Sequence, residues 1–180
     1  MAIDGEKIVL GSGSLYCMEF TGIMPEDTAI EVDTNLLGLI QGGASLEYKP
    51  TFYEAKDDLG KVSKVIITDE VATLKSGIMT WCGSTLEKLC NTARKTETAG
   101  IRTVKIGGIA NDNGKKYVLQ FVHEDPVDGD IRVAIVGQNQ AGFTLAFAKN
   151  KETVIDATFN AQPQDDNGTL ILYKEEIPTV

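Results

Sequence analysis

The residue best suited to acid–base chemistry is the single histidine, His123, which is followed directly by Glu124 and Asp125. A hydrolase would need this imidazole beside a serine or cysteine nucleophile, and the sequence alone places no such partner there. A lone histidine at a strand end is more often a surface residue or a hydrogen-bonded structural one. We therefore predict no catalytic residues and expect the protein not to be an enzyme.

Two further patterns carry oxygen ligands or glycines, and both are incomplete as binding signatures. Asp125, Asp128 and Asp130 lack the glycine and the distal glutamate of an EF-hand loop, so a solvated acidic turn is expected there. Residues 11–14, GSGS, lack the last glycine of a dinucleotide loop and the Lys-Ser or Lys-Thr of a phosphate loop. We expect no metal and no cofactor.

The cysteines and the tryptophan are interpreted as structural residues. Cys17, Cys82 and Cys90 are odd in number and have no short paired spacing, which disfavours a disulfide framework or a zinc ribbon. Trp81 precedes a predicted helix and is expected to anchor that helix on a sheet. Reduced thiols, with no signal peptide or membrane-spanning run expected, favour production in a cytoplasm.

The segment that begins at Ala44 has a clear strand pattern. Its two faces alternate, with Leu46, Tyr48, Pro50 and Phe52 on one and Glu47, Lys49, Thr51 and Tyr53 on the other. A period of two predicts a half-buried strand. Pro50 has no amide hydrogen to donate, so the strand should lie at a sheet edge or be bulged. An edge can pair with another subunit, which makes Tyr48, Pro50 and Phe52 candidates for an inter-subunit contact.

Residues 54–64 form a charged segment around Gly60, between this strand and the β-branched run Val65–Thr68. They are predicted to be a long hairpin tip. A further strand is expected over residues 71–80. Ser84 and Glu87 then have the spacing of a capping box, and Leu86, Leu89, Cys90 and Ala93 recur at helical steps, which predicts one helix over about residues 84–95.

The remainder of the chain has a strand pattern almost throughout. The predicted strands are residues 101–109, 116–123, 131–136, 143–148, 153–159 and 169–173. Closely spaced strands with one inserted helix predict a mainly β fold, a β-sandwich or half-barrel with a single flanking helix. We expect one domain, residues 1–180, because a chain of this length buries an adequate core without dividing.

The formal net charge is −9, from 26 acidic and 17 basic side chains. The surface should on the whole repel the phosphates of nucleic acid, so tight DNA binding is disfavoured. The same repulsion would suit a pore through which DNA slides.

Three stretches resemble the major tail tube proteins of long-tailed phages that infect Gram-positive bacteria. They are GGASLEYKPTFY at residues 42–53 with DDLG at 57–60, TLKSGI at 73–78 followed by Thr80 and Trp81, and LGSG at 10–13 followed by Leu15 and Tyr16. The first is the strongest cue. The resemblance covers about the first hundred residues, and the rest agrees by its β-rich pattern and by the order of elements.

The resemblance implies a structural virion protein that forms hexameric rings, stacked into the tail tube. Strands of neighbouring subunits would join into a β-barrel around the lumen, through which DNA passes without specific binding. The implied partners are copies of the same chain, a tape-measure protein, and tail tip and terminator proteins, with no membrane. Assembly would take place in the cytoplasm of the bacterial host.

In similar tube proteins a long loop between early strands reaches the adjacent ring. The resemblance assigns this role to residues 54–64, with Asp57, Asp58, Lys61 and Lys64 as candidate inter-ring contacts. The two ends of the chain, before the first strand and after Tyr173, are further candidates for inter-subunit arms, since termini often order on docking.

Two alternatives remain open at the level of the sequence. The chain could instead be the inner tube of a contractile phage tail, a tailocin or a secretion tube, because these share the subunit architecture. A β-sandwich module that binds a ligand such as a carbohydrate would need an exposed aromatic platform, and only 7% of the residues are aromatic.

Overall fold

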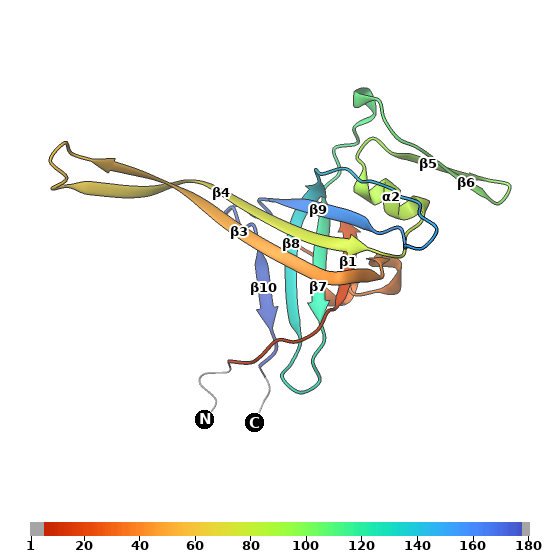
Figure 1. The fold of residues 1–180 in the computed structure, drawn as a ribbon, viewed down its shortest axis with the longest axis horizontal. Coiled ribbons are helices and arrows are strands. Elements are labelled where there is room, and N and C mark those ends of the chain that lie inside the picture. Colours follow the sequence, from red (N-terminus) through yellow and green to blue (C-terminus); the bar gives the residue numbers. More distant parts are fainter. Residues whose placement is uncertain (1–5, 178–180) are drawn as a thin grey trace.

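The computed structural model describes residues 6–177 and shows a mainly β protein (Figure 1). The strands are β1 (Ser14–Glu19), β2 (Leu36–Gly38), β3 (Ile40–Lys56), β4 (Ser63–Ile78), β5 (Arg94–Thr98), β6 (Ile101–Lys105), β7 (Tyr117–His123), β8 (Ile131–Asn139), β9 (Ile155–Gln162) and β10 (Leu172–Glu175). The helices are α1 (Asp27–Ile30), α2 (Gly83–Leu89) and the 3-10 turns η1 (Asp33–Asn35) and η2 (Ile109–Asn111).

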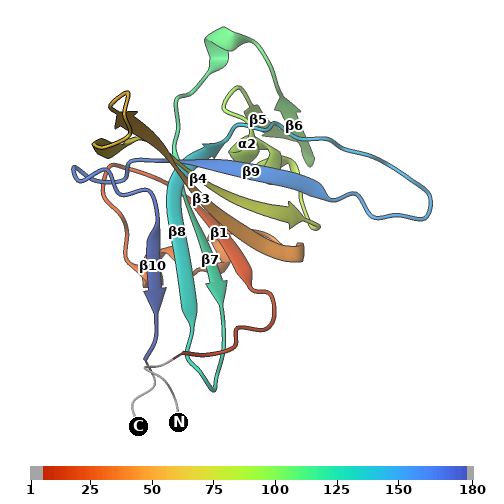
Figure 2. The same ribbon diagram turned by 60° about the vertical axis from the view of Figure 1, so that its left-hand side comes forward.

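Most strands belong to one hydrogen-bonded sheet in the order β2-β1-β7-β8-β9-β4-β3, and all its pairings are antiparallel. The sheet divides at β8. Along one edge, β8 pairs with β10 over residues 131–134 and with β9 over residues 136–139. Two layers result, and β9, β4 and β3 cross over β1, β7 and β8 (Figure 2). The predicted sandwich with few helices is confirmed.

The main core lies between these two layers. One layer contributes Leu15, Leu119 and Ile135, and the other contributes Leu74 and Phe159, all at most 1% exposed. A smaller cluster, Ile30, Val118 and Val136, covers the opposite face of β7 and β8 beneath α1. Strand β7 is therefore buried on both faces, which explains why its sequence is apolar except at Gln120 and at its last residue, His123.

The predicted helix over residues 84–95 is too long: α2 ends at Leu89. Its cap also differs: Cys82 is the N-cap residue, and the Thr85 hydroxyl accepts from the Cys82 amide, in place of the predicted pair Ser84 and Glu87. Arg94 and Lys95, assigned to the helix end, lie on β5. This strand pairs with β6 across Ala99 and Gly100, both with positive φ, so a tight turn and a ladder replace the last helical turn.

One predicted strand is absent from the described residues. The segment 143–148 lies in the connection between β8 and β9, with a single bridge from Ala148 to Lys151. Its apolar residues are used for packing: Phe143 and Leu145 contact the main core, and Phe147 lies against Trp81. The alternation of apolar residues in this segment therefore reflects the packing of their side chains on the main core. The segment has no neighbouring strand to pair with among the described residues.

Candidate functional site

The β3–β4 hairpin is the dominant surface feature. Both strands continue far beyond the rest of the sheet and project from the body (Figure 1). The ladder between β4 and β9 ends at the pair Thr73 and Asn160, whereas the β3–β4 ladder runs on to Lys56 and Ser63. We call residues 51–69, from the bulge at Thr51 outward, the arm; the remainder of the described chain is the body. At about 3.3 Å per residue, the arm reaches roughly 20 Å from Thr51 to its turn.

The candidate edge residues Tyr48, Pro50 and Phe52 lie where β3 approaches and enters the arm. β3 is the last strand of the sheet, which confirms the prediction that Pro50 marks an edge. The register also shifts between Thr51 and Phe52, so the predicted bulge is present one residue further along. The prediction of a half-buried strand is wrong for this part, because Tyr48 and Phe52 are 48% and 58% exposed.

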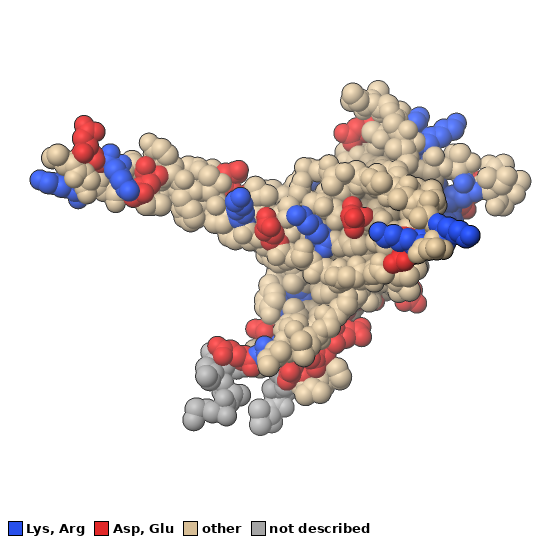
Figure 3. Space-filling view, in the orientation of Figure 1, with Lys and Arg blue, Asp and Glu red and all other residues tan. Residues whose placement is uncertain are grey.

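Apolar side chains cover both faces of the arm. Directly paired residues share a face, which puts Phe52 with Ile67 on one side and Tyr53 with Ile66 on the other. All four are exposed, as is Val65. In Figure 3 the length of the arm between the body and its tip carries few charges, and charged side chains gather at the tip. A two-sided apolar ribbon of this kind lacks the polar face that a solvated hairpin normally presents.

The tip is shorter than predicted. Residues 54–56 and 63–64 belong to the strands, and only residues 57–62 form the turn. Asp57 organises this turn: its carboxylate accepts from the amide of Val62 over 2.7 Å, and its carbonyl accepts from the amide of Gly60. The Val62 amide is also the main reason that the pKa of Asp57 lies below its ordinary value.

The other candidate inter-ring residues, Asp58, Lys61 and Lys64, are exposed around this turn. Among residues 6–177, none forms a hydrogen bond or an ion pair with these three side chains. The structure therefore brings all four candidates to the end of the arm, where Asp57 is engaged in the turn and the others face solvent.

At the base of the arm, the hydroxyl of Tyr48 donates to the carboxylate of Glu70 over 2.5 Å, and this bond raises the pKa of Tyr48. Further from the arm, near the start of β3, Gly42 and Gly43 have φ of +79° and +74° at a shift of the β3 register. Side chains other than glycine rarely adopt this conformation. Gly42 and Gly43, which begin the stretch GGASLEYKPTFY, therefore permit the irregular pairing at the start of β3.

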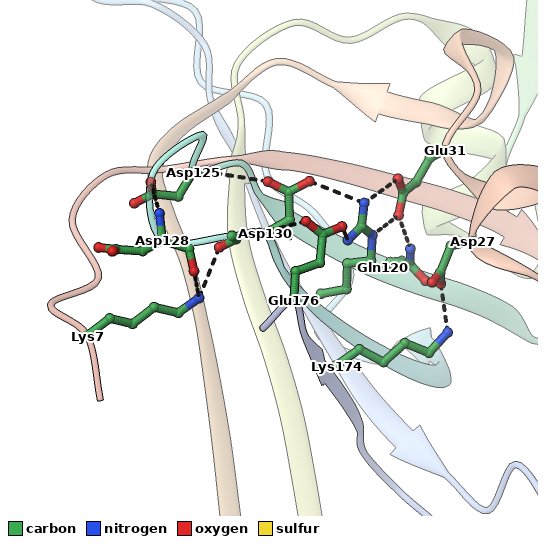
Figure 4. Close-up of polar contacts among 11 residues, drawn as sticks. Lys7, Asp27, Glu31, Gln120, Asp125, Asp128, Asp130, Lys174 and Glu176 are labelled. Carbon is green, nitrogen blue, oxygen red and sulfur yellow. Dashed lines mark hydrogen bonds and ion pairs between the residues drawn. The ribbon is translucent and has the colours of Figure 1, made fainter. Parts of the chain in front are cut away.

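The body holds a half-buried ion-pair cluster that sequence reasoning missed. The guanidinium of Arg132 donates to Glu31, Asp130 and Glu176, which come from three separate segments (Figure 4). Its bond to Glu31 is 2.7 Å long and is the main reason that the pKa of Arg132 is raised. Glu31 and Glu176 lie 101 and 44 residues from Arg132 in sequence, so no local spacing could have indicated these two partners.

The residues that the sequence offered for catalysis or metal binding form hydrogen bonds that stabilise turns and packing. Nδ1 of His123 lies 2.7 Å from the carbonyl oxygen of Ser12, and Asp125 accepts from the amides of Val127 and Asp128 in its own turn. Within residues 6–177, no three His, Cys, Asp or Glu side chains converge to hold a metal ion. Trp81 contacts the main core, and its indole donates to the carbonyl of Thr153, which ties the start of α2 to the segment that precedes β9.

The chain ends, as far as they are described, lie along the body. Lys7 donates to the carbonyls of Asp128 and Gly129, and Lys174 pairs with Asp27. The predicted terminal arms otherwise fall on residues 1–5 and 178–180, outside the described residues. No helix within residues 6–177 has the length and apolar character needed to cross a membrane.

Comparison with known proteins identifies no relative: no protein-family model matches the chain, and no curated protein sequence matches it.

Proposed function

We propose that this protein is a non-enzymatic structural subunit that assembles with copies of itself into stacked hexameric rings, forming the tail tube of a long-tailed phage. The observation that carries the proposal is the arm. It supports self-assembly, and the resemblance of residues 10–16, 42–60 and 73–81 to tail tube proteins supports the kind of assembly.

The arm needs a covering partner for energetic reasons. An isolated two-stranded hairpin is at best marginally stable in water, and contiguous exposed apolar side chains mark contact surfaces. Burying Phe52, Tyr53, Ile66 and Ile67 against another chain would contribute about 1.5–3 kcal/mol for each side chain. A projecting arm cannot cover itself, so its natural cover is a neighbouring molecule.

The free edge of β3 offers a second contact. Tyr48, Pro50 and Phe52 lie on the terminal strand of the sheet, whose outer backbone groups pair with no strand of the described chain. Such an edge recruits a strand from another chain. A contact between two different surfaces of identical subunits repeats from copy to copy, and it closes into a ring or continues as a filament.

The proposed tube would enclose the tape-measure protein during assembly, end at tip and terminator proteins, and then pass DNA. The net charge of −9 supports a conduit that does not hold its cargo, because phosphates are repelled by a surface of the same sign. The protein would be assembled in the bacterial cytoplasm and reside in the virion.

Negative-stain electron microscopy of the purified protein at high concentration tests the proposal. Rings or hollow tubes with a central channel are expected. A protein that stays monomeric at every concentration, and also when incubated with preformed tail tips, would contradict it.

A charge reversal tests the inter-ring residues separately. Asp57→Lys with Asp58→Lys should shorten the tubes or lower their yield, and raised salt should weaken the same contact in the unmodified protein. Tubes of normal length and yield from this variant would remove the turn from the inter-ring contact.

A further inference from the structure

The β5–β6 hairpin is a separate two-stranded sheet with one uncovered face. Its inner face packs on α2, where Lys95 donates to the hydroxyl of Ser84 and Val104 is half-buried. Successive residues of a strand point to opposite faces, so the neighbours of Lys95 and Val104 form the outer face. All members of this outer face are exposed; they are Arg94, Thr96, Thr98, Ile101, Thr103 and Lys105.

The two cations of the outer face lie directly opposite each other, because Arg94 pairs with Lys105 in the register of the two strands. Like charges at directly opposite positions destabilise a strand pair. Among residues 6–177 neither side chain forms an ion pair, and Arg94 donates to the carbonyl of Gly107. The other two basic residues of the hairpin are each paired with a glutamate. A carboxylate from another molecule would relieve the repulsion between Arg94 and Lys105.

The opposite end of the body has the complementary charge. The β7–β8 connection, residues 124–130, and the end of β10, residues 175 and 176, carry six acidic side chains and no basic one. The two segments lie close together, because Ile131 pairs with both His123 and Glu175. In Figure 3 acidic side chains gather at this lower end of the body. We call these two segments the acidic end.

Four of the six carboxylates take part in no ion pair among residues 6–177. Arg132 pairs with the other two, Asp130 and Glu176 (Figure 4). Lys7 lies nearby, but its ammonium group donates to backbone carbonyls. The four without a cation are Glu124, Asp125, Asp128 and Glu175. The acidic end and the β5–β6 hairpin thus present unpaired charges of opposite sign.

These two surfaces are too far apart to meet within one molecule. The hairpin follows α2, and Asn139 at the end of β8 donates to the carbonyl of Leu89 in α2. The acidic end lies at the other end of β8, before Ile131 (Figure 1). β8 has nine residues and is therefore roughly 26 Å long at about 3.3 Å per residue. A contact between the two surfaces needs two copies.

We propose that the outer face of the β5–β6 hairpin binds the acidic end of a second copy, with Arg94 and Lys105 paired to carboxylates such as Glu124 and Glu175. This inference rests on the proposed self-assembly and names an end-to-end contact that does not use the arm. Charge complementarity selects this occupant: residues 94–105 carry four basic and one acidic side chain in a chain of net charge −9. Because the two surfaces differ, each copy binds one neighbour at each end, and the contact continues through an assembly.

Charge reversal on each surface, and then on both, tests this contact. Arg94→Glu with Lys105→Glu should raise the critical concentration for assembly more than about 10-fold, because like charges then face each other. Glu124→Lys with Glu175→Lys should do the same from the other surface. A chain with all four substitutions restores opposite charges at every contact, so its critical concentration should return to within about threefold of the unmodified protein. Sedimentation at one fixed salt concentration measures all of these.

Arg94→Lys with Lys105→Arg is the matched control, because it keeps both charges and should assemble normally. Thermal unfolding checks that each variant folds, since the substituted side chains are exposed. If the chain with four substitutions folds and assembles no better than the two reversed variants, the surfaces do not bind each other. If the variant Arg94→Glu with Lys105→Glu assembles normally but loses binding to a double-stranded DNA fragment, the two cations bind phosphates and the inference is overturned.

The outcomes separate this inference from the proposed function. If the unmodified protein forms tubes and the variant Arg94→Glu with Lys105→Glu forms them equally well, the end-to-end contact is absent and the tube remains. If the unmodified protein forms no assembly at any concentration, even with preformed tail tips, both proposals fail.

Discussion

The body and the arm use the same kind of residues in opposite ways. In the body, β-branched and aromatic side chains such as Ile135 and Phe159 are buried between two layers. In the arm, Phe52, Ile66 and Ile67 have the same chemistry and the same strand periodicity, yet about half of each side chain is exposed. The body is a complete folding unit in this respect, whereas the arm has the composition of a core and lacks the second layer.

The stability of the two regions should therefore have different sources. The body gains its stability from its own core and from contacts such as the Arg132 cluster. The arm should gain most of its order from a neighbouring molecule, because two strands without a covering layer are marginal in water. Substitutions in the two regions should therefore affect different measurements.

The largest effect is expected for charged residues on the apolar arm. Phe52→Asp with Ile67→Asp removes two side chains that each contribute about 1.5–3 kcal/mol when covered, so the critical concentration for assembly should rise more than about 100-fold. Sedimentation of assembled material measures this. Ile109→Asp, at an exposed apolar position of the body, is the matched control and should assemble normally. Equal loss in both variants would mean that the arm has no special role.

A core substitution should show the converse behaviour. Phe159→Ala should lower the free energy of unfolding by about 3–5 kcal/mol, because it opens a cavity between the layers. Phe52→Ala should change it by less than about 0.5 kcal/mol in the monomer. Urea unfolding at low protein concentration measures both. A comparable loss for Phe52→Ala would show that the arm is already covered within one molecule.

Much of this division could be predicted from sequence. The alternation after Ala44 and the missing amide hydrogen of Pro50 identified an edge strand, and Gly60 lies in the turn that joins the two strands of the arm. The exposure of the arm's side chains could not be predicted. A two-residue period shows which side chains share a face of the strand, but it does not show whether another layer covers that face.

Two predictions were wrong, the length of the helix over residues 84–95 and the strand over residues 143–148. Cys90 and Ala93 continued a helical spacing, but the positive φ of Ala99 and Gly100 allowed Arg94–Thr98 to pair as a strand instead. Phe143 and Leu145 alternated as a strand would, and they pack on the core from a connection without a partner strand. A local hairpin decided the first outcome, whereas contacts distant in sequence decided the second, as they also did for the bonds of Arg132 to Glu31 and Glu176.

A smaller effect is expected within the body from the half-buried ion pair. Glu31→Gln leaves Arg132 with weaker acceptors and should lower the free energy of unfolding by about 1–3 kcal/mol. Glu97→Gln, which breaks an exposed pair with Arg102, should lower the free energy of unfolding by less than Glu31→Gln does. Thermal unfolding of the two variants side by side measures the difference. Equal costs would show that the Arg132 cluster is as well solvated as a surface pair.

The smallest effect concerns the turn of the arm and its dependence on pH. The pKa of Asp57 is lowered in the folded turn, so its contribution is present above the ordinary carboxylate pKa and is lost as pH falls through the folded value, below about pH 4. The amide NMR signal of Val62 should therefore stay constant between about pH 8 and pH 5 and move only at lower pH. Asp57→Asn should abolish this titration. A shift near neutral pH would contradict the hydrogen bond between Asp57 and Val62.

Cryo-electron microscopy of the assembled protein tests the central claim most directly, because it shows what covers the arm. We expect residues 51–69 to be ordered, Phe52, Tyr53, Ile66 and Ile67 to be buried against a neighbouring copy, and the copies to surround a central channel. Assemblies held together by the body alone, with the arms exposed to solvent, would contradict it.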